Sequence, residues 1–391
     1  MSDAVREVGG EALEGWDAAA VDGPGGHVLQ SRAWAAHRAA GGWRPRFLAA
    51  GDARALVLER PWPVLPGGSA YLPRGPVVPA RAWSIPAGEA QPGRAADYGA
   101  GAAVGSALTA IVDHLALGGC DVVAADPEVA EGDSGYRAAL GTAGLHAIPE
   151  IQPSRHRMAI ALPDGGDEAA VFEGIAKATR QRIRRAERDR VVVVRWDAAP
   201  HDLEGSIRAT EAAPAALDRF YGLLRATGER RGFGFAGPSE FVTWWRRALD
   251  AGHLVYLEAR ESAPDGDVLG GLVLYRHGTR LSTAHSGDRT ERRRDHPGAM
   301  HLLRWRAIQL ALAEGRTEMD LGGVDVAGAR RIPAEGEPTY GLYEHKRSFG
   351  AEWVALAGAQ ERVVRSWRYA AGRATAKAAR VAGRAGGGSA A

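Results

Sequence analysis

Residues whose chemistry stands out are concentrated near the C-terminal end of the chain, where 340–350 read YGLYEHKRSFG. Two tyrosines, an acid, a histidine and two cations follow one another there, and Lys346 lies among the rings. Other cations in turn or helix patterns are Arg38 and Arg74, the second within YLPRGP (71–76). Cationic side chains of this kind are suited to binding phosphate or another anion.

Two longer basic stretches point to the same class of ligand. Residues 177–190 hold seven cations and two acids, and residues 360–391 hold seven cations and one acid, although the net charge of the chain is only +2. This pattern favours a polyanionic partner such as nucleic acid, a lipid surface or a diphosphate. A solvated arginine face is the alternative, and the sequence leaves both open.

Other kinds of catalytic site are poorly supported. The single cysteine, Cys120, excludes an intramolecular disulfide and a cysteine-built zinc site. His296 and His301 are not accompanied by a second ligand pair, and no Gly-x-Ser-x-Gly nucleophile motif is present. A pyrophosphate loop for coenzyme A is expected at 292–300, but Pro297 has no N–H to donate there. We therefore expect no metal and no coenzyme A at this loop.

Hydrophobic periodicity predicts the elements that position these residues. Each half of the chain has antiparallel strands followed by a helix and then a strand that carries an acid, Asp126 or Asp320. This repeat predicts an α+β fold made of two copies of one unit. Strands are expected at 47–50, 55–62, 69–78, 120–127, 158–163, 254–259, 268–276, 281–287 and 317–323, and helices at 31–41, 102–117, 171–190, 299–315 and 361–383.

Length and composition predict the domain organisation. A chain of 391 residues exceeds the size of one core, and prolines interrupt the pattern at 149–155. We expect an acidic flexible lead-in at 1–25, a first domain at 26–152 and a second at 153–357. A basic helix and a disordered tail are expected at 358–391. The most apolar run, 101–119, is broken by Asp113 and His114, which predicts a cytoplasmic protein without a membrane span.

Six motifs in order resemble the FemABX family of aminoacyl-tRNA-dependent peptidyltransferases. The resemblance covers about residues 26 to 365, and its motifs are WAAHR, YLPRGPVV, VAADP, ATRQRIRRAERDRV, MDLGG and YGLYEHKRSFG. It implies two tandem acetyltransferase-like (GNAT) domains, with the C-terminal helix packing back on the first. Some members carry a coiled-coil arm, and GERRGFGFAGPSEF leaves no room for one, so the chain resembles the armless subgroup.

The resemblance implies an aminoacyltransferase that moves an amino acid from aminoacyl-tRNA to an amine of a peptidoglycan precursor, lipid II or a UDP-linked muropeptide. No cofactor is implied, because aminoacyl-tRNA is the co-substrate. We also expect a monomer and a peripheral contact of the basic tail with an anionic inner membrane. The alternatives are a relative that uses aminoacyl-tRNA to modify a small amine in secondary metabolism, and a non-catalytic tRNA- or membrane-binding relative.

In the first half, the resemblance assigns roles to three residues. Arg38 aligns with a diphosphate-binding lysine, and Arg74 with a cation of the Pro-Arg-Gly-Pro turn, so both are candidate substrate-binding residues. Asp126 matches an acid that orients the incoming amine and is a candidate catalytic residue. A surface arginine, a turn-solvating arginine and a strand-end cap are the respective alternatives.

In the second half, Lys346 matches the lysine that the resemblance assigns to the tRNA acceptor end and the oxyanion. His345 stands where the family has Phe, so it either stacks on a base or exchanges a proton as a second catalytic residue. The same segment contributes substrate-binding residues and the basic helix contributes tRNA-binding residues. These are Arg347, Tyr340 and Tyr343, and Arg180, Arg184 and Arg188.

Overall fold

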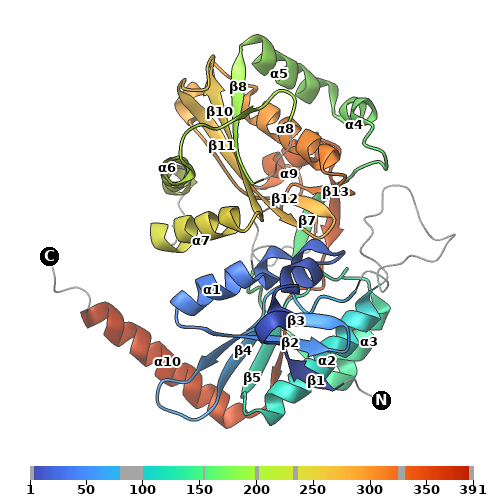
Figure 1. Cartoon of the computed structure of the whole chain (residues 1–391), viewed down its shortest axis with the longest axis vertical. Coiled ribbons are helices and arrows are strands. Elements are labelled where there is room, and N and C mark those ends of the chain that lie inside the picture. The colour runs from blue at the N-terminus through green and yellow to red at the C-terminus, as the bar shows by residue number, and fades with distance from the viewer. Residues whose placement is uncertain are drawn as a thin grey trace. The chain divides into compact units, whose positions relative to one another are not determined.

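The computed structural model describes residues 4–79, 100–152, 155–198, 202–231, 237–324 and 331–386. The chain divides into two compact units (Figure 1). Unit 1 comprises the described residues up to Arg155 together with those from Ala355 onward, and unit 2 comprises those of His156–Val354. The division falls between 155 and 156, at the end of the stretch 149–155 in which prolines interrupt the sequence pattern.

Unit 1 contains a seven-stranded sheet in the order β1-β2-β3-β4-β5-β15-β6. Only β4 and β5 pair in parallel; the chain reaches β5 through the long helix α2, as a parallel connection requires. The strands are β1 (Val5–Glu7), β2 (Arg44–Ala50), β3 (Ala53–Pro61), β4 (Gly68–Leu72), β5 (Val122–Ala125), β6 (His146–Ala147) and β15 (Gln360–Val363). The α-helices are α1 (Arg32–Ala40), α2 (Gly101–Leu117), α3 (Ser134–Ala143) and α10 (Ser366–Gly386).

Apolar side chains of unit 1 pack on both faces of its sheet. Alternate residues of β3 belong to two separate clusters, with Ala55 and Val57 facing α2 and Leu56 and Leu58 facing the N-terminal segment. Helix α1 begins after its N-cap Ser31, whose hydroxyl accepts a hydrogen bond from the amide of Trp34 at 3.0 Å.

The expected flexible lead-in at 1–25 is wrong for its described residues. Strand β1 pairs with β2, and the indole of Trp16 is 1% exposed and donates to Gln30 O at 2.7 Å. Val8 and Val21 are also buried. The acidic residues lie between these apolar positions, so the composition hides a segment that covers the second face of the sheet.

The C-terminal segment completes unit 1. Strand β15 pairs with β5 and β6 before α10 begins at Ser366, so the helix expected throughout 361–383 starts five residues later than predicted. Residues Gln360 to Val363 extend because they fill the place beside β5. The predicted tail at 387–391 lies outside the described residues.

Unit 2 contains an eight-stranded sheet in the order β14-β7-β13-β12-β11-β10-β8-β9. Its strands are β7 (His156–Ala161), β8 (Val191–Trp196), β9 (Ile207–Arg208), β10 (Leu254–Glu261), β11 (Val268–His277), β12 (Arg280–Asp288), β13 (Glu318–Asp320) and β14 (Glu352–Ala355). The α-helices are α4 (Glu168–Gly174), α5 (Lys177–Arg188), α6 (Ala213–Arg231), α7 (Pro238–Asp250), α8 (Ala299–Ala313) and α9 (Tyr340–Arg347).

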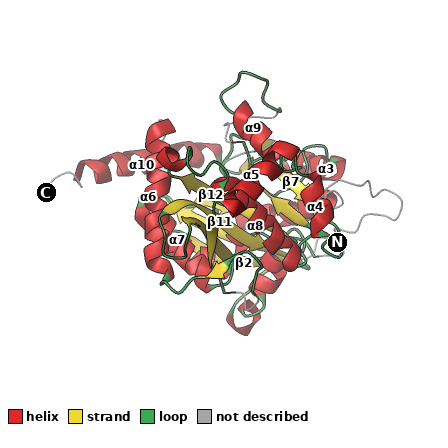
Figure 2. Ribbon diagram, turned by 90° about the horizontal axis from the view of Figure 1, so that it is seen from above, coloured by secondary structure: helices red, strands yellow, loops and turns green. Residues whose placement is uncertain are grey.

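Helices cover both faces of this sheet, with α5 and α8 to one side and α6 and α7 to the other (Figure 2). Val255 and Leu257 of β10 belong to the cluster that contains α8, whereas Tyr256 between them packs against Phe220 of α6. Alternation of side chains along a strand therefore explains why β10 and β11 read as continuous apolar runs.

The two units share one order of elements, as the sequence repeat predicted. In unit 1 the parallel pair β4 and β5 is joined by α2, and in unit 2 the parallel pair β12 and β13 is joined by α8. The fold class is α+β with two acetyltransferase-like units. The described residues include no coiled-coil arm, and none of their helices has the length and apolar composition needed to cross a membrane.

Candidate functional site

Of the parallel pair β12 and β13 in unit 2, strand β13 ends at a loop that presents polar backbone groups. Ser282 of β12 pairs with Asp320, the last residue of β13, and the loop 321–324 follows. The carboxylate of Asp320 accepts a hydrogen bond from the amide of Gly322 at 2.7 Å, which holds the loop in place. Gly322 has a φ of +75°, a conformation that glycine adopts without strain.

Helix α9 places the ammonium of Lys346 on this loop. Lys346 is 5% exposed, and its Nζ donates to Gly322 O at 2.9 Å and to Gly323 O at 2.5 Å. A Cβ at Gly322 would lie 3.1 Å from Thr283 O, which is tight, and 3.7 Å from that Nζ, which is an ordinary contact. The sequence did not predict this helix, which turns Lys346 inward at the end of strand β13.

The C-terminal end of α9 is joined to the start of α5. Ser348 O accepts a hydrogen bond from the Ala176 amide at 2.9 Å, and the hydroxyls of Ser348 and Thr179 are 2.8 Å apart. Phe349 is buried in the core beside them. Helix α5 and the end of helix α9, which are far apart in the sequence, are therefore held together by hydrogen bonds.

A set of basic side chains, hereafter the cationic cluster, surrounds this junction. Arg182 of α5 lies 3.3 Å from His301 Nε2 of α8, and the His301 and His345 rings meet edge to face at 4.9 Å between centroids. The cluster consists of Arg182, His301, Arg304, His345 and Lys346.

Burial and mutual repulsion shape the protonation of the cluster. Burial lowers the pKa of His345 to about 2, helped by the charges of Arg304 and Lys346 among its neighbours. Burial also lowers the pKa of His301 to about 4 and that of Arg304 to about 10. At neutral pH the two imidazoles are therefore neutral, while Arg304 keeps its positive charge.

The imidazole of His345 makes aromatic packing contacts in this arrangement. It packs edge to face on Phe349 at 5.5 Å as well as on His301. A base with so low a pKa accepts protons poorly at neutral pH. Of the two roles left open by the sequence, these contacts favour the aromatic one, and the predicted proton transfer by His345 has no support from its protonation state.

Acid is expected to destabilise unit 2 through these histidines. In the unfolded chain a histidine titrates near about pH 6.5, so unfolded molecules take up protons first as the pH falls, and the free energy of unfolding decreases. At about pH 5 the loss approaches about 2 kcal/mol for each of the two histidines, His301 and His345. Urea unfolding of wild type and His345→Phe near neutral pH and near pH ~5 measures this; the variant should lose less stability. Equal losses would contradict the burial of a neutral imidazole.

The other predicted residues of the lysine segment have separate contacts. The Arg347 guanidinium is exposed and pairs with Glu344, with Nε 2.9 Å from Oε1. The Tyr340 and Tyr343 rings lie 6.3 Å apart, and Tyr343 also meets Trp353 at 6.4 Å. Tyr343 therefore packs α9 against β14, and the substrate roles of these three residues stay predictions.

The predicted tRNA-binding arginines lie on the outer side of α5. Thr179, Ile183 and Ala186 are buried, which turns the exposed side chains of Arg184 and Arg188 toward solvent, with Arg180 partly covered. The Arg184 guanidinium lies over the Phe172 ring at 5.3 Å. Their spacing leaves a cationic surface on this helix.

The N-terminus of α8 is the expected position of a coenzyme A pyrophosphate loop. Gly298 stands at its cap, and a Cβ built there would lie 2.1 Å from the carbonyl oxygen of Arg182 and 3.0 Å from the Cβ of Ala186. Helix α5 therefore covers this end of α8. Together with Pro297, this packing leaves little room for a pyrophosphate at the amides.

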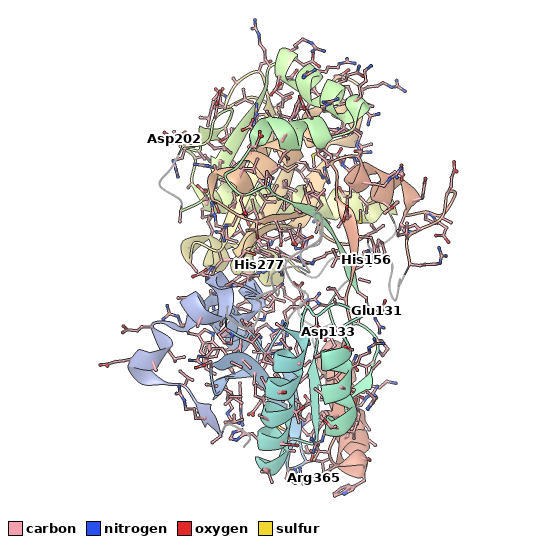
Figure 3. All side chains as sticks on the ribbon, turned by 90° about the vertical axis from the view of Figure 1, so that its right-hand side faces the viewer. Glu131, Asp133, His156, Asp202, His277 and Arg365 are labelled. Carbon is pink, nitrogen blue, oxygen red and sulfur yellow. The ribbon has the colours of Figure 1, made fainter. Side chains whose placement is uncertain are left out.

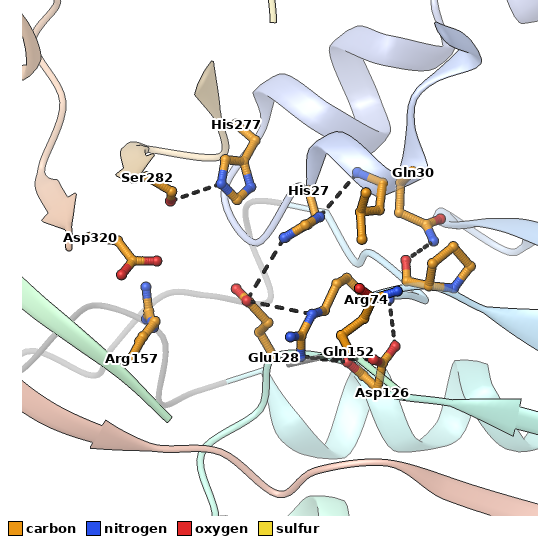
Figure 4. A network of polar contacts seen from close by, with 12 residues as sticks. His27, Gln30, Arg74, Asp126, Glu128, Gln152, Arg157, His277, Ser282 and Asp320 are labelled. Carbon is orange, nitrogen blue, oxygen red and sulfur yellow. Dashed lines mark hydrogen bonds and ion pairs between the residues drawn. The ribbon is translucent and has the colours of Figure 1, made fainter. Parts of the chain in front are cut away.

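Unit 1 carries a second polar group of side chains at the corresponding strand end (Figure 4). Asp126 follows β5, is 2% exposed, and accepts hydrogen bonds from the Tyr71 hydroxyl at 2.9 Å and the Arg74 amide at 2.8 Å. Burial raises the pKa of Asp126, and the charge of Arg74 opposes this shift. Burial likewise raises the pKa of Tyr71 well above its usual value, so its hydroxyl remains a donor.

Arg74 is positioned by this turn between two carboxylates. Its φ is +55°, its Nη1 lies 3.9 Å from Asp126, and its Nε lies 3.9 Å from Glu128. His27 Nε2 lies 3.9 Å from the same Glu128 oxygen. Asp126 therefore stabilises the Pro-Arg-Gly-Pro turn, which is the strand-end alternative, and its action on an amine stays a prediction.

Arg38 belongs to a different set of contacts in unit 1. Its guanidinium lies 5.4 Å from the Trp34 ring and 5.2 Å from the Trp43 ring. These cation–π contacts join α1 to the start of β2 and explain the arginine without a ligand. Its diphosphate-binding role is not tested by them.

Sequence reasoning missed four residues of these groups: Tyr71, Arg182, His301 and Arg304. A signal was present for the last two, because polar residues three apart in the otherwise apolar helix AMHLLRWRAIQLALA must be buried. His301 was considered only as a metal ligand. Arg182 was one arginine among many, and only the packing of α5 on α8 distinguishes it.

Comparison with known proteins agrees with this geometry. Residues 175–347 match the model of an acetyltransferase (GNAT) domain. A crystal structure of FemX is 17% identical, with 93% of this chain and 98% of that chain covered and a TM-score of 0.71. A conserved protein of unknown function from Bacteroides thetaiotaomicron VPI-5482 is 10% identical, with 92% and 99% covered and a TM-score of 0.51. The sequence matches no curated protein. The FemABX-type fold predicted from the motifs is thus confirmed: this chain has the fold of FemX, and its residues 175–347 match the model of an acetyltransferase (GNAT) domain.

Proposed function

We propose that this protein is an aminoacyltransferase that moves an amino acid from aminoacyl-tRNA to an amine of a peptidoglycan precursor stem peptide. The observation that carries the proposal is the position of Lys346, whose buried ammonium lies on the loop that follows β13, beside β12, and within the cationic cluster. A preorganised positive charge in a place shielded from water stabilises an oxyanion far better than it would in water.

The reaction needs little beyond positioning. The amine nitrogen attacks the ester carbonyl carbon of the aminoacyl-tRNA, and the carbonyl oxygen becomes the oxyanion near Lys346. The carbon–oxygen bond to the terminal ribose then breaks, the amide forms, and the amine proton passes to the leaving ribose hydroxyl. Because the ester is already activated, holding the two reactants and stabilising this charge supply most of the barrier reduction.

Two features favour tRNA over coenzyme A as the acyl donor. Helix α5 covers the N-terminus of α8 at Gly298, where a pyrophosphate would need free amides. The outer side of the same helix carries Arg180, Arg184 and Arg188, which suit a phosphate backbone. The packing of α5 on α8 therefore leaves little room for coenzyme A, and the outer side of α5 offers a cationic surface to tRNA.

A transfer assay with purified protein tests the proposal. Total tRNA charged with radiolabelled amino acids is offered with lipid II, with a UDP-linked muropeptide or with a mixture of small amines. Label is expected on a muropeptide. Label only on small amines would support the secondary-metabolism alternative, and label that stays on tRNA would support a non-catalytic relative. Acetyl transfer from acetyl-CoA, without aminoacyl transfer, would overturn the choice of donor.

A further inference from the structure

We propose that the start of α10 and the two loops beside it form a site that lies on the surface of an anionic lipid bilayer. This inference concerns unit 1 alone and goes beyond the transfer reaction. The site, hereafter the α10 patch, consists of the apolar side chains Val64, Leu117 and Trp367 and the exposed α10 cations Arg373 and Lys377.

The apolar part of the patch is unusually exposed. Leu117, Val64 and Trp367 are 89%, 77% and 72% exposed, whereas the other exposed large hydrophobic residues in the described chain are 41% to 46% exposed. The three come from the end of α2, the β3–β4 connection and the start of α10. Large apolar side chains gathered on a surface mark an interaction site more often than single ones do.

The buried carboxylate of Asp121 connects these three segments. Asp121 is fully buried and accepts a hydrogen bond from the Trp62 indole at 2.8 Å, while Arg368 Nε lies 3.3 Å and Arg365 Nη1 lies 3.5 Å from its Oδ1. Arg365 also donates to Ala116 O at 3.5 Å, next to Leu117. Arg365 lies at one extremity of unit 1 (Figure 3). Each of the three exposed apolar residues therefore lies a few residues from a hydrogen bond or an ion pair that holds its segment in place.

Helix α10 rests on this base through one small area. A Cβ at Gly372 would lie 2.2 Å from the Trp62 ring, and Tyr369 meets the same ring at 6.4 Å. Of the residues from 366 to 379, whose burial the structure describes, only Gly372 is buried. The sequence of α10 contains five cations and no acid. The other residues from 366 to 379 are exposed or half-buried, and most of them are basic or small.

This combination of side chains fits a bilayer better than a nucleic acid. Arginine and lysine attract both, and an aromatic ring can stack on a base or enter the lipid interface. The aliphatic Leu117 and Val64 gain by entering acyl chains, and they have no comparable partner on RNA. A basic helix that begins at an exposed tryptophan is the pattern of an interfacial helix, which lies on a membrane without spanning it.

Vesicle co-sedimentation of the full chain tests the α10 patch. Vesicles of phosphatidylglycerol and phosphatidylcholine are compared with vesicles of phosphatidylcholine alone, and binding is expected only to the first. Leu117→Ser with Trp367→Ser, or Arg373→Glu with Lys377→Glu, should weaken binding at least about tenfold. Trp367→Phe, which keeps an interfacial ring, should retain most of it.

Matched controls come from unit 2. Ile207→Ser with Ile332→Ser removes two exposed apolar side chains, and Arg225→Glu with Arg294→Glu reverses two exposed cations. Both should bind vesicles as wild type does, and circular dichroism establishes that each variant is folded. Unchanged binding by folded patch variants, or patch variants that lose tRNA affinity but keep vesicle affinity, would overturn the proposal. Transfer to a UDP-linked muropeptide, which needs no membrane, separates this outcome from failure of the proposed function.

Discussion

Replacing Lys346 by methionine is expected to slow aminoacyl transfer by about 10²- to 10³-fold, the cost typical of removing one oxyanion donor. Methionine keeps the length and apolar stem of the side chain but removes the charge. Affinity for tRNA should change little, because the exposed arginines of α5 remain. Single-turnover transfer rates and tRNA binding, measured on the same preparation, separate the two effects.

A change of an exposed cation in the same unit provides the control. Arg225 of α6 pairs only loosely with Glu229, at 3.5 Å, and both side chains are more than 60% exposed. Arg225→Met should therefore leave the transfer rate within about twofold of wild type, as surface substitutions usually do. A Lys346→Met enzyme that is folded and equally fast would remove Lys346 from the mechanism.

Replacing Asp126 by alanine is expected to lower the free energy of unfolding by about 3 kcal/mol, since a buried hydroxyl and a backbone amide lose their shared acceptor and a nearby cation loses an opposite charge. The hydroxyl is that of Tyr71, the amide is that of Arg74, and the cation is the Arg74 guanidinium, 3.9 Å from the carboxylate. Tyr71→Phe alone should cost about 1 kcal/mol, and the double variant should cost less than the sum. Urea unfolding monitored by tryptophan fluorescence gives these values.

The matched control for this prediction is Asp113→Ala. Asp113 also pairs with an arginine of unit 1, Arg362, but its side chain is 54% exposed. An exposed ion pair contributes less than about 1 kcal/mol. A comparable loss of stability in both alanine variants would mean that burial does not determine the importance of Asp126.

The elements were largely predictable because their signals are local. Ser31 begins α1 as a cap, the apolar run at 299–313 is a buried helix, and the strand pattern repeats in both units. The prediction for the lead-in at 1–25 was wrong because acidic residues are more numerous there than the apolar side chains that are buried against the sheet. Trp16 is buried against the second face of a sheet that includes residues 44 to 61. This contact joins residues that are distant in the sequence, so no local sequence pattern predicts it.

The sequence by itself determined the α+β repeat, the FemABX resemblance and the types of residue available for chemistry, because periodicity, turn residues and ordered motifs are properties of the chain. Only the tertiary structure decided what those residues do to one another. Lys346 meets the carbonyls of residues more than twenty positions away, and Arg182 and His301 are separated by 119 positions. The low pKa of His345 comes from burial and from charges on three helices. Such effects depend on distance through space and on exclusion of water, which a linear sequence does not record.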